Sequence, residues 1–193
     1  MFSTRLSFDL TPNRLSAALS RLRSAGVAID DLTESNPTCA GVEYPPRLLD
    51  ALSTPEGLTY DPQPFGLPEA RQAVVDDFRR RGLAVSRDRV VLTSSTSEAY
   101  SLLFKLLCDP GDEVLVPVPS YPLFEYLAGL DAVQVRPYRL DDHGGWSYDV
   151  DAIRRVTTPR TRAVVLVSPN NPTGSYLKRQ ELDAIAGHCS AHD

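Results

Sequence analysis

The sequence predicts an α/β fold in three layers, in which a mostly parallel sheet is covered by helices on both faces. Two observations carry this prediction. From residue 89 onward, aliphatic segments typical of strands alternate with segments of helical periodicity, which is the pattern of βαβ units. The chain also has 193 residues, of which 42% are hydrophobic, and this is enough to build a core.

Three helices are predicted before residue 89. Leu15, Leu19 and Leu22 recur at helical spacing in the first of them. Pro68 suits the first turn of the third helix, and Gly82 suits the position just after its end. The predicted helices span residues 12–24, 47–52 and 68–81, with a turn-rich, extended connector over 31–46.

Strands and helices alternate through the rest of the chain. Each expected strand is rich in β-branched and aliphatic residues, and each expected helix carries apolar residues three or four positions apart. The polar, glycine-containing segment 139–149 predicts a loop. The expected strands are 89–93, 113–118, 132–138 and 163–168, and the expected helices are 97–108, 122–130, 150–156 and 178–188.

Charge and composition argue against several classes of protein. A formal net charge of −5 does not suit a general nucleic-acid binder, which needs a basic face. No run approaches the roughly eighteen apolar residues of a membrane span, and the N-terminus has no apolar core of signal-peptide length. Cys39, Cys108 and Cys189 lie far apart in the sequence with no C-x-x-C, so neither a zinc knuckle nor a disulfide framework is indicated. We therefore expect a cytoplasmic protein with reduced thiols.

Several familiar α/β chemistries also lack their motifs. The sequence contains no G-x-G of a dinucleotide-binding turn, no phosphate-binding G-x-x-x-x-G-K-[ST], and no G-x-S-x-G of a serine hydrolase. His188 and His192 have the i, i+4 spacing of a metal-binding pair, but no third ligand is evident. His143 is most simply a polar loop residue. No metal site is predicted.

Hydroxyl residues gather where the predicted strand 89–93 meets the next helix. Ser94, Ser95, Thr96 and Ser97 are consecutive, and Glu98 follows just inside the helix. One hydroxyl and one acidic residue are explained by helix capping. Four hydroxyl residues exceed what a cap needs, and the free N–H groups of a helix N-terminus favour an anion. The junction is consistent with capping alone and with a bound phosphate.

Two later strand ends carry further candidates. Tyr121 lies between two prolines after the strand 113–118, and the stretch S-P-N-N-P-T-G over 168–174 follows the strand 163–168. An aromatic residue at a strand end is commonly part of the core, and Asn, Pro and Gly make ordinary turns. Ligands of open α/β sheets, however, bind at the carboxyl ends of the strands. A phosphate site, an aromatic face and the amide of Asn171 would converge at that edge.

Four motifs in order resemble one family. They are Y-D-P-Q-P-F-G-L-P-E-A-R at 60–71, S-S-T-S-E-A at 94–99, P-S-Y-P at 119–122 and N-N-P-T-G at 170–174. Together they resemble the pyridoxal-phosphate-dependent aminotransferases of class I/II, which have fold type I. The resemblance covers nearly the whole chain, from the D-L-T-E-S-N-P-T segment at 31–38 onward.

The resemblance implies specific roles at the cofactor. Ser95, Thr96 and Ser97 would hold the phosphate of pyridoxal phosphate through their hydroxyls and backbone amides. Tyr121 would stack on the pyridine ring, and Asn171 would donate to the ring's phenolic oxygen, an interaction that tunes the bound cofactor. Asn170 is expected to support the loop.

The family also implies a homodimer. Tyr60 would reach the cofactor phosphate of the partner subunit, although a packed core tyrosine is the simpler alternative. Ser35 or Asn36 would contact the substrate. Amino acids and 2-oxo acids are the implied substrates. The implied domains are a helix and extended arm over 1–46, belonging to a small domain, and an incomplete large cofactor-binding domain over 47–193.

The groups that would perform the chemistry are not identifiable in this sequence. The family places its Schiff-base lysine, pyridine-nitrogen aspartate and carboxylate-binding arginine C-terminal to N-P-T-G. The chain has two lysines, Lys105 and Lys178, and each falls in or at a predicted helix. We therefore expect a truncated aminotransferase that is inactive by itself. A pyridoxal-phosphate C–S lyase or synthase of the same fold is one alternative, and a non-catalytic interaction protein is another.

Overall fold

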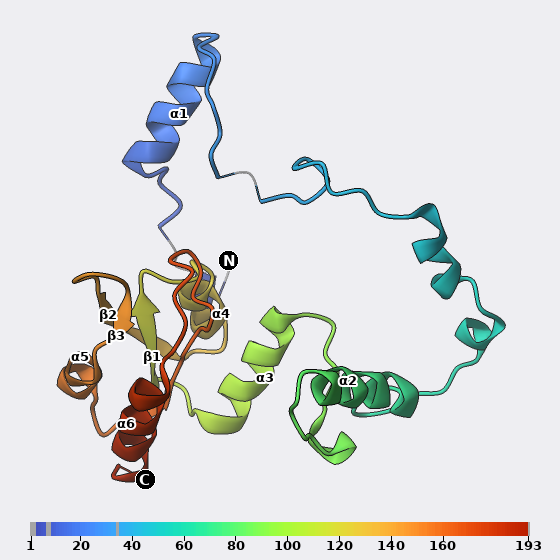
Figure 1. Ribbon diagram of the computed structural model, residues 1–193. Coiled ribbons are helices and arrows are strands. Elements are labelled where there is room, and N and C mark those ends of the chain that lie inside the picture. The colour runs from blue at the N-terminus through green and yellow to red at the C-terminus, as the bar shows by residue number, and fades with distance from the viewer. Residues whose placement is uncertain (1–2, 7–8, 34, 193) are drawn as a thin grey trace. The chain divides into compact units, whose positions relative to one another are not determined.

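The computed structural model describes residues 3–6, 9–33 and 35–192 (Figure 1). Residue 34, in the predicted connector, lies outside the described residues. Residues 3–6 and 93–192 form one compact unit, and the described part of 9–92 forms a second. We call them the sheet unit and the helical unit. The domain boundary predicted between residues 46 and 47 stays a prediction.

The sheet unit is built on four strands in the order β3-β2-β1-β4 among the described residues. β1 (Glu113–Val118) runs parallel to β2 (Gln134–Asp141) on one side and to β4 (Thr161–Val164) on the other, whereas β3 (Ser147–Tyr148) pairs antiparallel with β2. Val114 and Leu115, in the middle of β1, are completely buried. A strand this apolar is typical of the centre of a parallel sheet.

Alternate residues of β1 face two separate cores. Val114 and Val116 pack with side chains of α3 (Thr96–Leu107) and α4 (Phe124–Leu130), while Leu115 packs with α5 (Val150–Val156) and α6 (Arg179–Ser190). α4 therefore lies on one side of the sheet and α5 and α6 on the other (Figure 1). This arrangement confirms the predicted three-layer α/β fold.

The β1–β4 ladder is interrupted by a proline. The Val165 N–H donates to the Leu115 carbonyl over 2.8 Å, so the next donor toward β4 would be the N–H that Pro117 lacks. The Tyr138 hydroxyl replaces it and donates to the Val165 carbonyl over 2.7 Å. The Tyr148 hydroxyl similarly serves Val167, donating to its carbonyl over 2.7 Å and accepting from its N–H over 3.1 Å. Two buried tyrosines thus complete the hydrogen bonding at the carboxyl end of the sheet.

The helical unit contains α1 (Arg14–Ser24) and α2 (Pro68–Arg80). Arg71 of α2 donates from Nε to the Val90 carbonyl over 2.7 Å, and from Nη2 to the Arg87 carbonyl over 2.6 Å. The Leu92 N–H donates to the Phe65 carbonyl over 3.0 Å. Short 3-10 helices complete both units, at Thr4–Leu6, Pro46–Leu52, Pro55–Leu58 and Arg87–Arg89. None of the described helices has the length and apolar character needed to cross a membrane.

Three predicted elements differ clearly from the structure, and the helix predicted at 47–52 is a 3-10 helix, Pro46–Leu52. The strand predicted at 89–93 is wrong: Arg89 ends a 3-10 helix, and residues 90–93 pair with no described strand. An apolar sequence becomes a strand only beside a partner, and here the nearby carbonyls accept from Arg71 instead. The loop predicted at 139–149 contains a hairpin, because β2 continues to Asp141 and pairs with β3. β4 begins at Thr161 and ends at Val164, earlier than predicted.

Candidate active site

Two loops leave the same edge of the sheet. β1 and β4 are parallel, so their carboxyl ends lie together. β1 is followed by the loop of residues 119–122, which carries Tyr121, and β4 leads into the loop of 168–175, which carries Asn171. The side-chain amide of Asn170 joins the two loops by donating to the Pro119 carbonyl over 3.2 Å. The predicted aromatic and amide residues therefore lie on loops that touch.

Asn170 also closes its own loop. Its N–H donates to the Ser175 carbonyl over 2.8 Å, and its carbonyl accepts from the Gly174 N–H over 2.7 Å. Its side-chain amide donates to Thr173 Oγ1 over 2.8 Å. Asn170 is only 3% exposed, whereas its neighbour Asn171 is exposed. The buried amide supports the loop as expected, and Asn171 is the one of the two that solvent or a ligand can reach.

The N-terminus of α3 is capped by a side chain, and it also has hydrogen-bond donors that the cap does not use. Ser95 is the N-cap, and its Oγ accepts from the Glu98 N–H over 3.1 Å. Glu98 in turn accepts from the N–H and hydroxyl of Ser94, over 2.6 and 2.8 Å. The hydroxyls of Thr96 and Ser97 make no hydrogen bond to another described residue, and the N–H groups of a first helical turn have no intrahelical partner. These donors, with the Ser95 O–H, fit a phosphate.

Electrostatics divide this helix end into two parts. The hydrogen bonds from Ser94 hold the pKa of the Glu98 carboxyl below its ordinary value, so the carboxylate is charged at neutral pH and occupies the donors of Ser94. A second anion would be repelled from that side. It would be attracted instead to the unpaired first-turn N–H groups beside Thr96 and Ser97, where the helix dipole is positive.

An aromatic cluster connects α3 to the loop that carries Tyr121. Tyr100, one helical turn after Thr96, packs edge-on against Phe124 with ring centroids 5.0 Å apart. Phe124 packs edge-on against Tyr121 at 5.8 Å. Phe124 is 3% exposed, and burial raises the pKa of the Tyr100 hydroxyl. Because Tyr100 and Tyr121 both contact this ring, the first turns of α3 and the tyrosine loop are held near each other.

The remaining predicted site residues belong to the helical unit. Tyr60 is 91% exposed, so within the described residues it is not a core tyrosine. Ser35 and Asn36 are also exposed, and Asn36 Oδ1 accepts from the N–H and hydroxyl of Thr38 over 3.1 and 2.7 Å. Their predicted roles stay predictions.

The two lysines lie on or beside helices, Lys105 in α3 and Lys178 at the start of α6. Lys105 lies near the C-terminal end of α3, about 13 Å along the helix from Thr96 at 1.5 Å per residue, and it pairs with Asp131. Lys178 precedes α6, is largely exposed, and lies 3.9 Å from Glu181. Each lysine has an ordinary structural partner.

The three histidines have structural partners as well. Thr157 donates its hydroxyl proton to the Ile153 carbonyl over 2.9 Å, so His188 Nε2, 2.9 Å from that hydroxyl, must be the donor to it. Burial, with smaller contributions from His192 and Arg154, lowers the pKa of His188.

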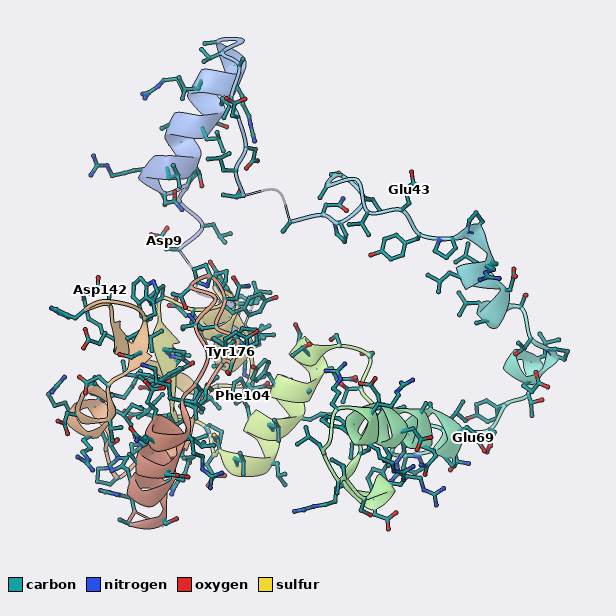
Figure 2. The ribbon with its side chains drawn as sticks, in the orientation of Figure 1. Asp9, Glu43, Glu69, Phe104, Asp142 and Tyr176 are labelled. Atoms are coloured by element: carbon teal, nitrogen blue, oxygen red, sulfur yellow. The ribbon has the colours of Figure 1, made fainter. Side chains whose placement is uncertain are left out.

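His143 instead pairs with Asp141, and this interaction raises the pKa of His143. With Asp142, at the tip of the β2–β3 hairpin (Figure 2), these side chains could approach one cation. All three are exposed.

Sequence reasoning missed how the site is assembled. The spacing of Ser95 and Glu98 is a readable capping signal, but the use of Ser94 by Glu98 depends on side-chain geometry. The contact between Asn170 and Pro119 joins residues 51 positions apart, and no local pattern encodes it. No sequence signal distinguishes Tyr100 from an ordinary helical residue, because its contact with Phe124 is a tertiary contact.

The chain is similar in sequence to known aminotransferases. The model of the family described as "Aminotransferase class I and II" matches residues 33–193. An aspartate/prephenate aminotransferase of Thermus thermophilus is 36% identical over 178 residues, covering 89% of this chain and 45% of that protein. A glutamate-pyruvate aminotransferase of Escherichia coli is 32% identical, covering 90% and 43%.

The chain is also similar to solved structures of aminotransferases. An alanine aminotransferase from Pyrococcus furiosus has a TM-score of 0.83 at 31% identity, and the match covers 100% of this chain and 50% of that one. A Thermus thermophilus aspartate aminotransferase mutant has a TM-score of 0.81 at 32% identity, covering 100% and 51%. The chain spans about half the length of the relatives it matches.

Proposed function

The chain belongs to the class I and II aminotransferase family, and on that premise we propose that it is the N-terminal, cofactor-holding part of a pyridoxal-phosphate-dependent aminotransferase. The whole enzyme would move an amino group from an amino acid to a 2-oxo acid in the cytoplasm. No disulfide bond joins the three cysteines among the described residues, which suits a reducing compartment.

One observation carries this proposal. The N-terminus of α3 has hydrogen-bond donors that suit an anion, and the two loops that carry Tyr121 and Asn171 are in contact with each other. The Ser95, Thr96 and Ser97 donors at the start of α3 would hold the cofactor phosphate. Tyr121 would stack on the pyridine ring and restrict its tilt, and the amide of Asn171 would donate to the phenolic oxygen. Bound pyridoxal phosphate supplies the electron sink that stabilises negative charge at the substrate's α-carbon.

Residues of the helical unit would complete the site in a homodimer. We infer that Tyr60 donates its hydroxyl to the cofactor phosphate of the partner subunit. Its 91% exposure in the single chain supports this role, because a large aromatic side chain this exposed is available to a partner. Ser35 and Asn36 would contact the substrate, and their exposure is consistent with that.

A binding measurement on the 193-residue chain tests the proposal. Pyridoxal phosphate and pyridoxal, which lacks the phosphate, are titrated separately and followed by calorimetry. We expect the phosphate form to bind at least about tenfold more tightly, since each hydrogen bond to a charged group contributes about 1.5–3 kcal/mol. Ser97→Ala should remove most of this difference. Ser190→Ala, an exposed serine at the end of α6, is the matched control.

The same titration can refute the proposal. Equal affinities for the two ligands would show that no phosphate site exists at the start of α3. An unchanged preference in Ser97→Ala together with Thr96→Val would show that the phosphate binds elsewhere.

A further inference from the structure

We propose that Asn170 is a positioning residue: its side-chain amide locks the loop that carries Asn171 to the loop that carries Tyr121. The separation between the ring-stacking face and the donor to the phenolic oxygen would then be set by one buried amide. This inference rests on the proposed function for its consequence at the cofactor. The loop lock itself can be tested without any ligand.

The contacts of Asn170 fix the orientation of its amide. Pro119 offers only a carbonyl oxygen, so the group 3.2 Å from it must be Nδ2. The second Nδ2 proton goes to Thr173 Oγ1 at 2.8 Å. Both donors are thus used, one within the loop of residues 168–175 and one across to the loop of 119–122. An exchange of the amide nitrogen and oxygen would set two acceptors against each other.

Burial makes this contact matter. Asn170 is 3% exposed, and its Oδ1 is buried without a hydrogen-bond partner among the described residues, as is the Oγ of Ser120. A buried polar atom without a partner is costly. An asparagine would be a poor choice here for packing alone, since a leucine would fill the space without that cost. Its donors to Pro119 and Thr173 supply the reason for an amide.

The lock lies immediately beside the groups that would face the cofactor. Asn171 is the next residue, and Tyr121 is two residues beyond Pro119. Tyr121 is also held on its other side by Phe124. Loss of the Asn170 contact would therefore free the Pro119 end of the tyrosine loop while leaving its Phe124 end in place, and the ring would lose its fixed distance from Asn171.

Backbone ¹⁵N relaxation of the ligand-free 193-residue chain tests the lock. Ser120 and Tyr121 carry the N–H groups of the tyrosine loop, since Pro119 and Pro122 have none. We expect their order parameters to be about 0.85 in the native chain and to fall below about 0.6 in Asn170→Leu, which keeps the branching and the number of heavy atoms but removes both donors. Asn171→Leu, the matched change at the exposed neighbour, should leave them unchanged.

Three results would overturn the inference. They are order parameters in Asn170→Leu equal to the native values, an equal fall in Asn171→Leu, or a tyrosine loop that is already flexible in the native chain. If Asn170→Leu does not fold by circular dichroism, Asn170→Asp replaces it, because a carboxylate keeps the shape and loses both donors. The same fall below about 0.6 is then expected.

Titration with pyridoxal phosphate separates this inference from the proposed function. We expect about tenfold weaker binding in Asn170→Leu. If the native chain binds the ligand and Asn170→Leu binds it equally well, positioning at the cofactor is refuted. If no chain binds it while Asn170→Leu still loosens the loop, the lock is confirmed and the proposed function fails.

Discussion

Pro117 lies inside β1, and it has no N–H to donate to the Val165 carbonyl, which follows the neighbouring strand β4. Prolines are rare in central strands for this reason. Here the hydroxyl of Tyr138, 1% exposed, reaches the Val165 carbonyl from the other side of β1. Burial raises the pKa of this hydroxyl, so it stays protonated and remains a donor at any physiological pH. The carboxyl end of the sheet, from which both site loops emerge, therefore depends on single side-chain hydroxyls.

Tyr138→Phe should destabilise the chain by about 1–3 kcal/mol, because it leaves a buried carbonyl with no donor. Tyr148→Phe should cost a similar amount, since its hydroxyl serves both the carbonyl and the N–H of Val167. Urea unfolding measures the change. Tyr176→Phe, at a 72% exposed tyrosine, should be neutral. Equal stability of all three variants would contradict the replacement of the Pro117 N–H by tyrosine hydroxyls.

Two histidines should give the chain opposite pH responses. Burial lowers the pKa of His188 in the folded chain, so its contribution to stability is complete above the unfolded value of about 6.5 and is lost as the pH falls through the folded value. The Asp141 interaction raises the pKa of His143, so its contribution is complete below about 6.5 and is lost as the pH rises through the raised value.

Urea unfolding of variants at pH 7.5 and 5.5 separates these contributions. His188→Gln should reduce the loss of stability on acidification, and His143→Gln should increase it. If the free energy of unfolding changes by the same amount between pH 7.5 and 5.5 in the native chain and in both variants, the two predicted histidine contributions are contradicted. The reverse pair of slopes would show that His188, not His143, has the charged partner.

At the scale of elements, β4 has the sequence of a central strand and the position of an edge strand. Along β4 and the three residues that follow it, Ala163, Val165 and Val167 pack toward one core, and Val164 and Leu166 pack toward the other. No described strand pairs with the outer side of β4. Since Val165 bonds to Leu115, the N–H and C=O of Val164 point to that open side. Unpaired apolar edges of this kind promote association between chains.

Two proline variants test the open edge. Val164→Pro removes an N–H that β1 does not use, so it should keep the fold and reduce self-association in sedimentation velocity. Val165→Pro removes the N–H that donates to the Leu115 carbonyl and should destabilise the chain by about 1–3 kcal/mol, because that carbonyl is left without its donor. Self-association of Val164→Pro equal to that of the native chain would show that β4 is not the contact.

These elements also show what sequence can predict. The strand 113–118 and the helix 150–156 were predicted with their observed bounds, because periodicity and caps define them locally. Residues 90–93 have the same aliphatic character as a strand but no neighbour, and pairing is a property of the whole sheet.

One part of the candidate site can likewise be predicted from local sequence, and another part cannot. The donors at Ser95, Thr96 and Ser97 could be read from a local motif. The coupling of Tyr121 to Asn171 through Asn170 and Pro119 could not, because it depends on strand order.

At the scale of the whole molecule, the chain carries groups that would hold a cofactor, and each of its two lysines lies beside a carboxylate. It spans about half the length of its relatives. Lys105 pairs with Asp131 at the far end of α3, and Lys178 is associated with Glu181. Our central claim is that the 193-residue chain recognises pyridoxal phosphate without forming a covalent bond to it, and has no transaminase activity alone.

Borohydride trapping followed by peptide mass spectrometry tests this claim most directly. The chain is saturated with pyridoxal phosphate, reduced, digested and searched for lysines bearing the cofactor. We predict saturable binding that is lost on dialysis, with reduced adducts at Lys105 and Lys178 far below one per chain and unchanged by Ser97→Ala. A stoichiometric adduct at either lysine, abolished by Ser97→Ala, would contradict the account.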